Sequence, residues 1–387
     1  MIEFRLTTEI SELAAAGLTR RRRLLESPCG RTATVDGKNV LNFASNDYLG
    51  LAGNAEIAQA MADGALQWGA GSGASHLVSG HLAPHEALEK EIAAFVGFPH
   101  ALTFSTGYLA NLAIVPTLAG RGAAIFSDKL NHASLIDAMQ LAKANGAEVQ
   151  RYPHGDVTAL ERLLATSTTA TKLIVTDAVF SMDGDLAPLP LLYALAERYD
   201  AWLVIDDAHG FGVLGKNGRG SLSHFNLPAT PRILLMGTLG KAAGVGGAFV
   251  GGSETAIEFL LQKARSYIFT TAAPPAIACA LSKSLALIEN GDARRANLFA
   301  RIGQLRDGLA GLPWQLLPSA TAIQPLIVGD NEAALALANA LWERGFWVPA
   351  IRPPTVPKGT ARLRISLSAA HNAGDIDHLI TALRSLA

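Results

Sequence analysis

The chain has 387 residues, of which 49% are hydrophobic and 17% charged, a composition that permits large buried cores and excludes a globally disordered protein. Its 32 Lys and Arg residues balance 33 Asp and Glu residues to a net charge of -1, so the charge indicates no binding to nucleic acid or to an anionic membrane surface. Two cysteines without a CxxC pair or a cluster of His and Cys argue against disulfides and zinc sites, and the lack of a secretory signal or a ~20-residue apolar run predicts a cytoplasmic protein.

The first 45 residues predict an N-terminal arm. A helical segment opens the chain, and Asp36-Gly37 predicts the turn of a short hairpin. We assign residues 1–45 to this arm.

Between about residues 100 and 250, short apolar runs alternate with amphipathic helical stretches. The runs, typical of strands buried on both faces of a largely parallel sheet, are Ala101–Phe104, Ala123–Phe126, Leu173–Thr176, Trp202–Ile205 and Ile233–Met236. The helical stretches include Ser134–Ala144, Val157–Ala165 and Leu191–Tyr199. This alternation predicts an α/β domain, which we place at residues 46–285. Gly247–Gly251 follows the fifth run after a turn too short for a crossover, so we expect an antiparallel strand there.

After about residue 285 the pattern predicts a smaller α+β domain at residues 286–387. The expected helices are Ala293–Leu309 and Glu332–Arg344, and the expected strands are Ile323–Val328, Trp347–Ile351 and Leu363–Leu367. Arg352–Pro357 contains three prolines and predicts a rigid non-helical loop.

Ligands of an open α/β sheet bind at the carboxyl ends of its strands, so the loops there are the first place to look for functional residues. The first run leads to Gly107 and Tyr108, where a helix begins and free backbone N–H groups could bind a phosphate. An ordinary strand-to-helix turn explains the same residues. His132, after the second run, could stack on an aromatic cofactor, relay a proton or be structural.

Asp206 directly follows the fourth run and precedes Asp207 and His209. A carboxylate at the end of a buried strand is costly unless it is paired, and a cationic ring nitrogen would be a fitting partner. His209 could then hydrogen-bond a phenolic oxygen on the same ring. A metal site is the alternative, although no further ligands recur at a suitable spacing.

Lys241 follows the fifth run within the glycine-rich segment Gly237–Gly244. Desolvation there lowers the pKa of an amine and favours imine formation, and Thr238 could donate its hydroxyl to a phosphate. A nucleotide P-loop does not fit, because Ala242 follows the lysine where Ser or Thr is required. An acid, a histidine and a lysine, each after an apolar strand, together predict a pyridoxal 5′-phosphate (PLP) site.

Four segments together resemble the α-oxoamine synthase family of fold type I PLP-dependent transferases. They are Ser45–Leu51, Phe180–Asp185, Asp206–Gly210 and Thr238–Lys241. The resemblance covers the chain from about residue 10 to its end, and it implies a mostly parallel central sheet with a smaller C-terminal α+β domain. Ala74 and Ala242 stand where relatives often have Gly, so backbone strain would differ if either position needed a positive φ.

The resemblance also implies roles around the cofactor ring. Lys241 resembles the lysine that forms the Schiff base with PLP, and Asp206 resembles the partner of the pyridine nitrogen. His132 matches a ring-stacking histidine, and Ser181 and His209 match groups near the phenolic oxygen. Lys241, His132, Asp206 and His209 are the candidate catalytic residues.

Further positions match the family's phosphate and substrate contacts. Gly107, Tyr108 and Thr238 fall where the family binds PLP near its phosphate. The candidate substrate contacts are Arg20, Asn46, Thr355 and Arg364, of which Arg364 is similar to the arginine that holds the amino-acid carboxylate. A solvated basic helix is the alternative explanation of the run that begins at Arg20.

Within the family, Arg352–Pro357 and Ala361–Arg364 look most like the branch that serves biotin synthesis. This implies a decarboxylating condensation of L-alanine with a pimeloyl thioester, carried by CoA or by an acyl carrier protein. Glycine C-acetyltransferase or another α-oxoamine synthase is the alternative. The resemblance further implies a homodimer in which Ser266–Ala273 reaches the partner's phosphate site, with no metal, nucleic acid or membrane as a partner.

Overall fold

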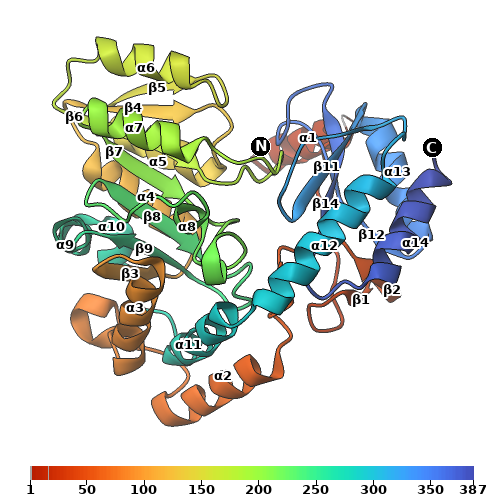
Figure 1. Cartoon of the computed structure of the whole chain (residues 1–387), viewed down its shortest axis with the longest axis horizontal. Helices are drawn as coiled ribbons and strands as arrows, with labels where there is room; N and C mark the ends of the chain where they lie inside the picture. The colour runs from red at the N-terminus through yellow and green to blue at the C-terminus, as the bar shows by residue number, and fades with distance from the viewer. Residues whose placement is uncertain (1, 16) are drawn as a thin grey trace.

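The apolar runs form the strands of a seven-stranded sheet in the computed structural model, which describes residues 2–15 and 17–387 (Figure 1). From edge to edge the strands are β3 (His100–Phe104), β9 (Ala248–Gly252), β8 (Ile233–Thr238), β7 (Trp202–Asp206), β6 (Thr171–Asp177), β4 (Ala123–Asp128) and β5 (Glu148–Tyr152). Neighbours are parallel except that β9 runs antiparallel to both β3 and β8. The antiparallel strand expected after the fifth run is confirmed.

Helices cover both faces of this sheet, which is why its inner strands are mostly apolar. On β7, Leu203 and Ile205 pack into one core and Val204 into the other. The first core contains side chains of α3 (Ala83–Val96), α6 (Val157–Thr166), α7 (Leu189–Arg198) and α11 (Pro275–Glu289). The second contains side chains of α4 (Gly107–Leu118), α5 (Ala133–Ala144), α9 (Glu254–Lys263) and α10 (Arg265–Ile268). Residues between these elements also form α2 (Ala55–Trp68), η1 (His76–Gly80), η2 (Lys216–Gly218) and α8 (Ser221–His224).

The smaller domain is built on a four-stranded antiparallel sheet. Its order is β10 (Gln315–Leu316), β11 (Ile323–Gly329), β14 (Ala361–Ser366) and β13 (Ala350–Ile351). The helices here are α12 (Asp292–Gly308), α13 (Asn331–Glu343) and α14 (Ala373–Arg384). The single strand expected at Trp347–Ile351 is wrong, because β12 (Phe346–Trp347) and β13 belong to two different sheets.

The predicted N-terminal hairpin is confirmed, and it pairs with the C-terminal part of the chain. β1 (Thr32–Val35) and β2 (Lys38–Asn42) are joined through Asp36 and Gly37, whose φ angles of 49° and 76° are those of a primed turn. β2 pairs in parallel with β12, and Arg31 bonds Asp375 at 2.8 Å. The division into residues 1–45, 46–285 and 286–387 stays a prediction.

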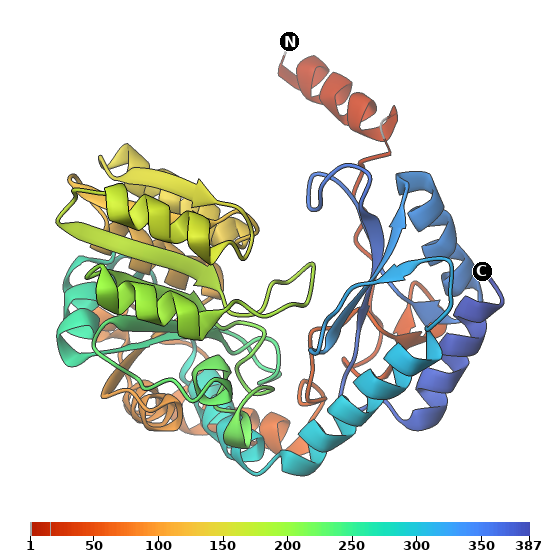
Figure 2. The ribbon, with the colours of Figure 1, turned by 45° about the horizontal axis from the view of Figure 1, so that its top comes forward.

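The first helix, α1 (Ile2–Ala15), projects from the rest of the chain (Figure 2). None of its described residues is buried. Its apolar side chains therefore have no partner in the described part of this chain. None of the helices that the structure describes is long and apolar enough to cross a membrane.

Candidate active site

The carboxyl ends of the parallel strands open into one cavity. Eight residues expected from the sequence line it: Gly107, Tyr108, His132, Ser181, Asp206, His209, Thr238 and Lys241. Ser134, Asp177, Ala208 and Met236 complete the lining. The lining residues lie on or directly after the strands β3, β4, β6, β7 and β8, so five strands of one sheet contribute to a single site.

Lys241 is the candidate nucleophile of this cavity. Burial lowers the pKa of its amine to about 8, against the opposing attraction of Asp206. Its Nζ lies 2.8 Å from Nε2 of His209. A substantial fraction of the amine is therefore neutral, and able to attack a carbonyl, near neutral pH.

His209 joins Lys241 to a chain of hydrogen bonds that ends in the small domain. Its Nδ1 lies 2.6 Å from the Tyr48 hydroxyl, which donates to Oδ1 of Asn46 at 3.0 Å. This network is satisfied when His209 carries its proton on Nδ1 and accepts from Lys241 at Nε2. Burial and the nearby Lys241 amine lower the pKa of His209 well below its ordinary value, so the ring is neutral.

Asp206 is buried, and its two carboxylate oxygens have different partners. Oδ2 accepts from the side-chain amide of Asn111 at 2.8 Å, and Oδ1 accepts from the backbone N–H of Ala208 at 3.0 Å. Asp207 instead accepts from Ser221, away from the cavity lining, and burial raises its pKa to about 7. Of the two adjacent acids, Asp206 is the one that faces the site.

His132 and Asp177 lie beside Asp206. The Cα atoms of Asp177 and Asp206 are partners in the register of β6 and β7, and burial together with the Asp206 charge raises the pKa of Asp177 well above its ordinary value. The backbone N–H of His132 donates to Asp177 at 3.1 Å. Nδ1 of His132 accepts from the N–H of Ser134, so a neutral His132 carries its proton on Nε2.

The other end of the cavity has the donors that a phosphate requires. α4 begins at Gly107 after Thr106, whose side chain accepts from Leu109 N–H, and the first turn of a helix leaves backbone N–H groups free for an anion. Thr238 adds a hydroxyl at the end of β8. Tyr108 is exposed, and its hydroxyl bonds Asp137.

Arg364 and Arg362 lie two residues apart on β14, are both nearly buried, and differ in how their charge is compensated. Arg362 forms a 2.7 Å ion pair with Asp183. Arg364 donates to Ser181 O at 2.7 Å and to Asn46 Oδ1 at 3.1 Å, but it has no ion-pair partner among the described residues. A buried guanidinium without a carboxylate partner can hold an anionic ligand, so Arg364 is a candidate for such a contact.

The loop that carries Ser181 is fixed from both domains. His154 lies 3.0 Å from Asp128 and 2.9 Å from Asp185, and Ser319 and Thr321 both donate to the carbonyl of Gly184. Gly184 has a φ of 71°, and a Cβ there would lie 2.4 Å from the Ile323 carbonyl oxygen, so glycine is required.

None of the four candidate substrate contacts lines the cavity: Arg20 and Thr355 are exposed, whereas Asn46 and Arg364 are connected to it through Tyr48 and His209. The segments of Arg20 and Thr355 are nevertheless neighbours, because Arg352 donates to the carbonyl of Gly17. Several residues of the site had no role assigned from the sequence: Tyr48 and Asn111, which contact His209 and Asp206, and the lining residues Ser134, Asp177, Ala208 and Met236. Tyr48 lies in a segment that carried the family resemblance, and Asp177 directly follows a predicted strand, so the sequence offered a signal for both. It offered none for Asn111.

Sequence comparisons with known proteins agree with a PLP site in this cavity. Residues 38–383 match the family model described as aminotransferase class I and II. The chain is 82% identical over 387 residues to an 8-amino-7-oxononanoate synthase from Dechloromonas aromatica and 62% identical over 389 aligned residues to one from Herminiimonas arsenicoxydans, each alignment covering 100% of both chains. The chain belongs to the 8-amino-7-oxononanoate synthase family.

Solved structures agree with this family and its fold. A serine palmitoyltransferase from Sphingomonas wittichii has a TM-score of 0.92 at 31% identity, over 98% of this chain and 96% of that one. An 8-amino-7-oxononanoate synthase from Francisella tularensis has a TM-score of 0.77 at 32% identity, over 90% and 98%. A serine palmitoyltransferase from S. paucimobilis with a TM-score of 0.92 and 30% identity, over 98% of this chain and 96% of that one, has PLP bound. The fold type I fold and the PLP dependence expected from the sequence are confirmed.

The cavity of this family member fits PLP. It offers an amine of lowered pKa, a buried carboxylate for a cationic ring nitrogen, an imidazole for the ring and a helix start for the phosphate. The positive φ angles of the described residues do not include Ala74 or Ala242, so neither departure from Gly strains the backbone.

We expect PLP to attach to Lys241 at a rate that follows the neutral fraction of its amine. With a pKa of about 8, attachment to cofactor-free protein should accelerate ~tenfold per pH unit below pH 8 and level off above it. Borohydride reduction and peptide mass spectrometry should find the cofactor on Lys241. Lys241→Ala should lose attachment and turnover, whereas Lys263→Ala should keep both; cofactor trapped on another lysine would contradict the assignment.

We expect His154 to stabilise the fold in a pH-dependent way. Asp128 and then Asp185 raise its pKa from 6.5 to about 10, so its contribution is complete below pH 6.5 and is lost as the pH rises through 10. At pH 6 the free energy of unfolding of the wild type should exceed that of His154→Gln by roughly 1–3 kcal/mol, a value discounted because His154 is partly exposed. This difference should shrink as the pH approaches 10. Urea unfolding of both proteins at pH 6, 8 and 10 measures it; a pH-independent difference would refute the ion pairs.

Proposed function

We propose that the protein condenses L-alanine with a pimeloyl thioester, releasing CO2 and the free thiol, to give 8-amino-7-oxononanoate for biotin synthesis in the cytoplasm. The observation that carries this is the 82% identity over the whole chain to an 8-amino-7-oxononanoate synthase. The thiol of the thioester belongs to CoA or to an acyl carrier protein.

We assign separate roles in the reaction to polar residues of the cavity. PLP, when bound, accepts the electron pair left on the amino-acid α-carbon when its proton is removed. Lys241 removes that proton at Nζ, which its lowered pKa allows near neutral pH. His209 accepts a hydrogen bond from Nζ and so holds the amine in place between transfers. Asp206, held by Asn111 and Ala208, keeps a negative charge where the cofactor nitrogen must stay protonated.

Further residues bind the substrates. Arg364 holds the carboxylate of alanine, because its buried charge lacks a carboxylate partner among the described residues. Asn46 orients Arg364, since its Oδ1 accepts from both Arg364 and Tyr48. His132, which lines the cavity beside Asp206, would stack on the cofactor ring and could polarise the thioester carbonyl. Arg20 and Thr355 belong to neighbouring segments that we assign to the pimeloyl chain.

Glycine C-acetyltransferase remains the competing function, because the lysine chemistry is shared by the whole family. The TM-scores do not separate members: a serine palmitoyltransferase reaches 0.92 and an 8-amino-7-oxononanoate synthase 0.77. Fold similarity is therefore uninformative about the substrate, whereas identity along the whole chain favours alanine and a pimeloyl group.

We expect kcat/KM to be highest for alanine with a pimeloyl thioester. One methyl group is worth only ~1–3 kcal/mol, so glycine should retain some activity. The enzyme should discriminate more strongly between acyl chains than between amino acids, because the far carboxylate of the pimeloyl chain can bind a cationic group such as Arg20. The test compares pimeloyl, acetyl, succinyl and palmitoyl thioesters with alanine, glycine and serine. A preference for glycine with acetyl-CoA would assign the protein to the acetyltransferase branch.

We also propose that the protein works as a homodimer. α1 exposes Leu6, Ile10 and Leu13, whose spacing places them on one helix face. A second exposed set consists of Val78, 79% exposed, and Phe269, 69% exposed. Their segments are adjacent, because Ser75 and Thr271 form a β-bridge. Apolar side chains exposed to this degree favour contact with a second copy of the chain.

We expect the purified protein to sediment as a dimer. Val78→Asp together with Phe269→Asp should shift it toward monomer and weaken PLP binding, because the loop Ser266–Ala273 would no longer reach the partner's site. Leu191→Asp, an exposed leucine on α7, should leave the dimer intact. A monomeric wild type that binds PLP and is fully active would rule the proposal out.

A further inference from the structure

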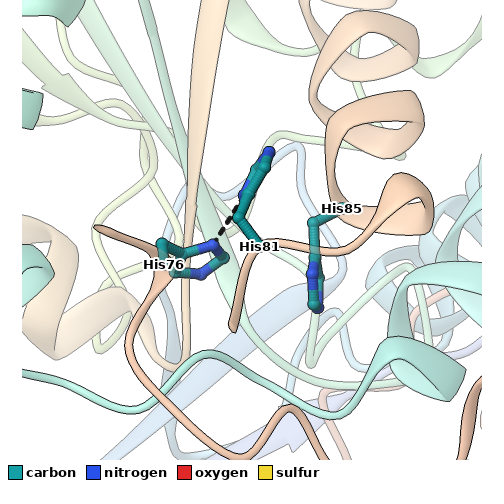
Figure 3. A group of neighbouring side chains, drawn as sticks. All are labelled: His76, His81 and His85. Carbon is teal, nitrogen blue, oxygen red and sulfur yellow. Dashed lines mark hydrogen bonds between the residues drawn. The ribbon is translucent and has the colours of Figure 1, made fainter. Parts of the chain in front are cut away.

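Three histidines gather outside the active site, between η1 and the first turn of α3 (Figure 3). They are His76, His81 and His85, and one nitrogen of each lies within 4.8 Å of one nitrogen of each of the others. The expectation of no such cluster was wrong. It arises because η1 turns the chain back, so residues five and nine positions apart meet.

The hydrogen bonds of the cluster define the protonation of His81. Its Nε2 lies 3.1 Å from the Glu86 carboxylate, which only accepts, so Nε2 carries the proton. Nδ1 of His81 is therefore a lone pair, and it lies 2.8 Å from Nδ1 of His76. A carboxylate that orients the far nitrogen of a histidine is the arrangement found behind metal-ligating histidines.

His76 supplies the second nitrogen. Its ring stacks on Tyr267 with centroids 5.1 Å apart and planes at 11°, which fixes the direction of Nδ1. The proton between the two Nδ1 atoms can move to the far nitrogen of His76, which leaves two lone pairs facing one point.

We propose that His76 and His81 bind a divalent transition-metal ion, Zn²⁺ in particular, through their Nδ1 atoms, with His85 as a third ligand. Imidazole nitrogens suit Zn²⁺, at a Zn–N distance of about 2.0–2.1 Å in a tetrahedral arrangement. The 2.8 Å between the two Nδ1 atoms must then widen by a few tenths of an ångström, a small rotation of rings that are not fully buried.

To bind the metal, His85 must give up one of the two hydrogen bonds that its ring nitrogens form. Its Nδ1 accepts from the N–H of Leu82 at 3.0 Å, and its Nε2 donates to the carbonyl of Ala273 at 2.8 Å. The second bond ties the cluster to the loop Ser266–Ala273, as does the bond from Ala272 N–H to the carbonyl of Ala74. Bound metal would hold η1, α3 and this loop together, so the ion is structural and separate from the chemistry at Lys241.

The experiment measures metal binding to the untagged, PLP-loaded protein after chelator treatment and removal of free PLP. Zn²⁺ should bind at one ion per chain by equilibrium dialysis and raise Tm, and Co²⁺ should give the visible bands of a tetrahedral site. His76→Gln and His81→Gln should abolish the Zn²⁺ binding, the rise in Tm and the Co²⁺ bands. Glu86→Gln should weaken binding ~10–100-fold, because it removes only the group that orients His81.

The control is His378→Gln, an exposed histidine on α14, which should bind metal like the wild type. Circular dichroism and the bound-PLP spectrum verify that each variant is folded. A wild type that binds no Zn²⁺, or His76→Gln and His81→Gln variants that bind it with unchanged affinity, would overturn the proposal and leave the cluster as a hydrogen-bonded network.

Discussion

The compensation of charge at the end of an apolar sheet is the constraint on which the rest of this structure depends. The strands are buried on both faces, so every ionisable group at their carboxyl ends loses hydration. Asp206 is held by Asn111 and Ala208, while its neighbour Asp177 is driven toward the protonated form. The same burial that lowers the pKa of Lys241 raises that of Asp177, so a neutral base and a carboxyl group driven toward its neutral acid form lie at the same end of the sheet.

A second consequence is that the small domain takes part in the chemistry of the large one. The chain of contacts Lys241, His209, Tyr48, Asn46 and Arg364 crosses from β8 to β14. Arg364 also donates to the carbonyl of Ser181, whose loop is held through Arg362 and His154. A shift of either domain would therefore disturb the orientation of Lys241 and of Arg364. This explains why so many polar side chains hold the loop that carries Ser181.

The sequence predicted the interior of the sheet well, because strands buried on both faces must be apolar. β5 was not expected, since it lies at the edge and exposes Glu148 and Arg151. The residues that end strands, Asp206 and Thr238, were found by the same logic, and the family resemblance supplied Arg364. Asn111 was missed because its partner is 95 positions away, and the histidine cluster because it depends on a π-helical turn that no periodicity indicates.

We propose that substrate choice is separated from the lysine chemistry. Burial, Asp206 and Arg364 set the pKa of Lys241 inside the molecule, whereas the segments of Arg20 and Thr355 lie at the surface and meet through Arg352 and Gly17. A serine palmitoyltransferase with a TM-score of 0.92 to this chain has the same fold, so the fold alone does not decide the acyl group. If Arg364 holds the amino-acid carboxylate, as we propose, discrimination between amino acids has to come from the volume around the α-carbon, where a methyl group is worth only ~1–3 kcal/mol. Discrimination between acyl chains would then come from the charge at their far end.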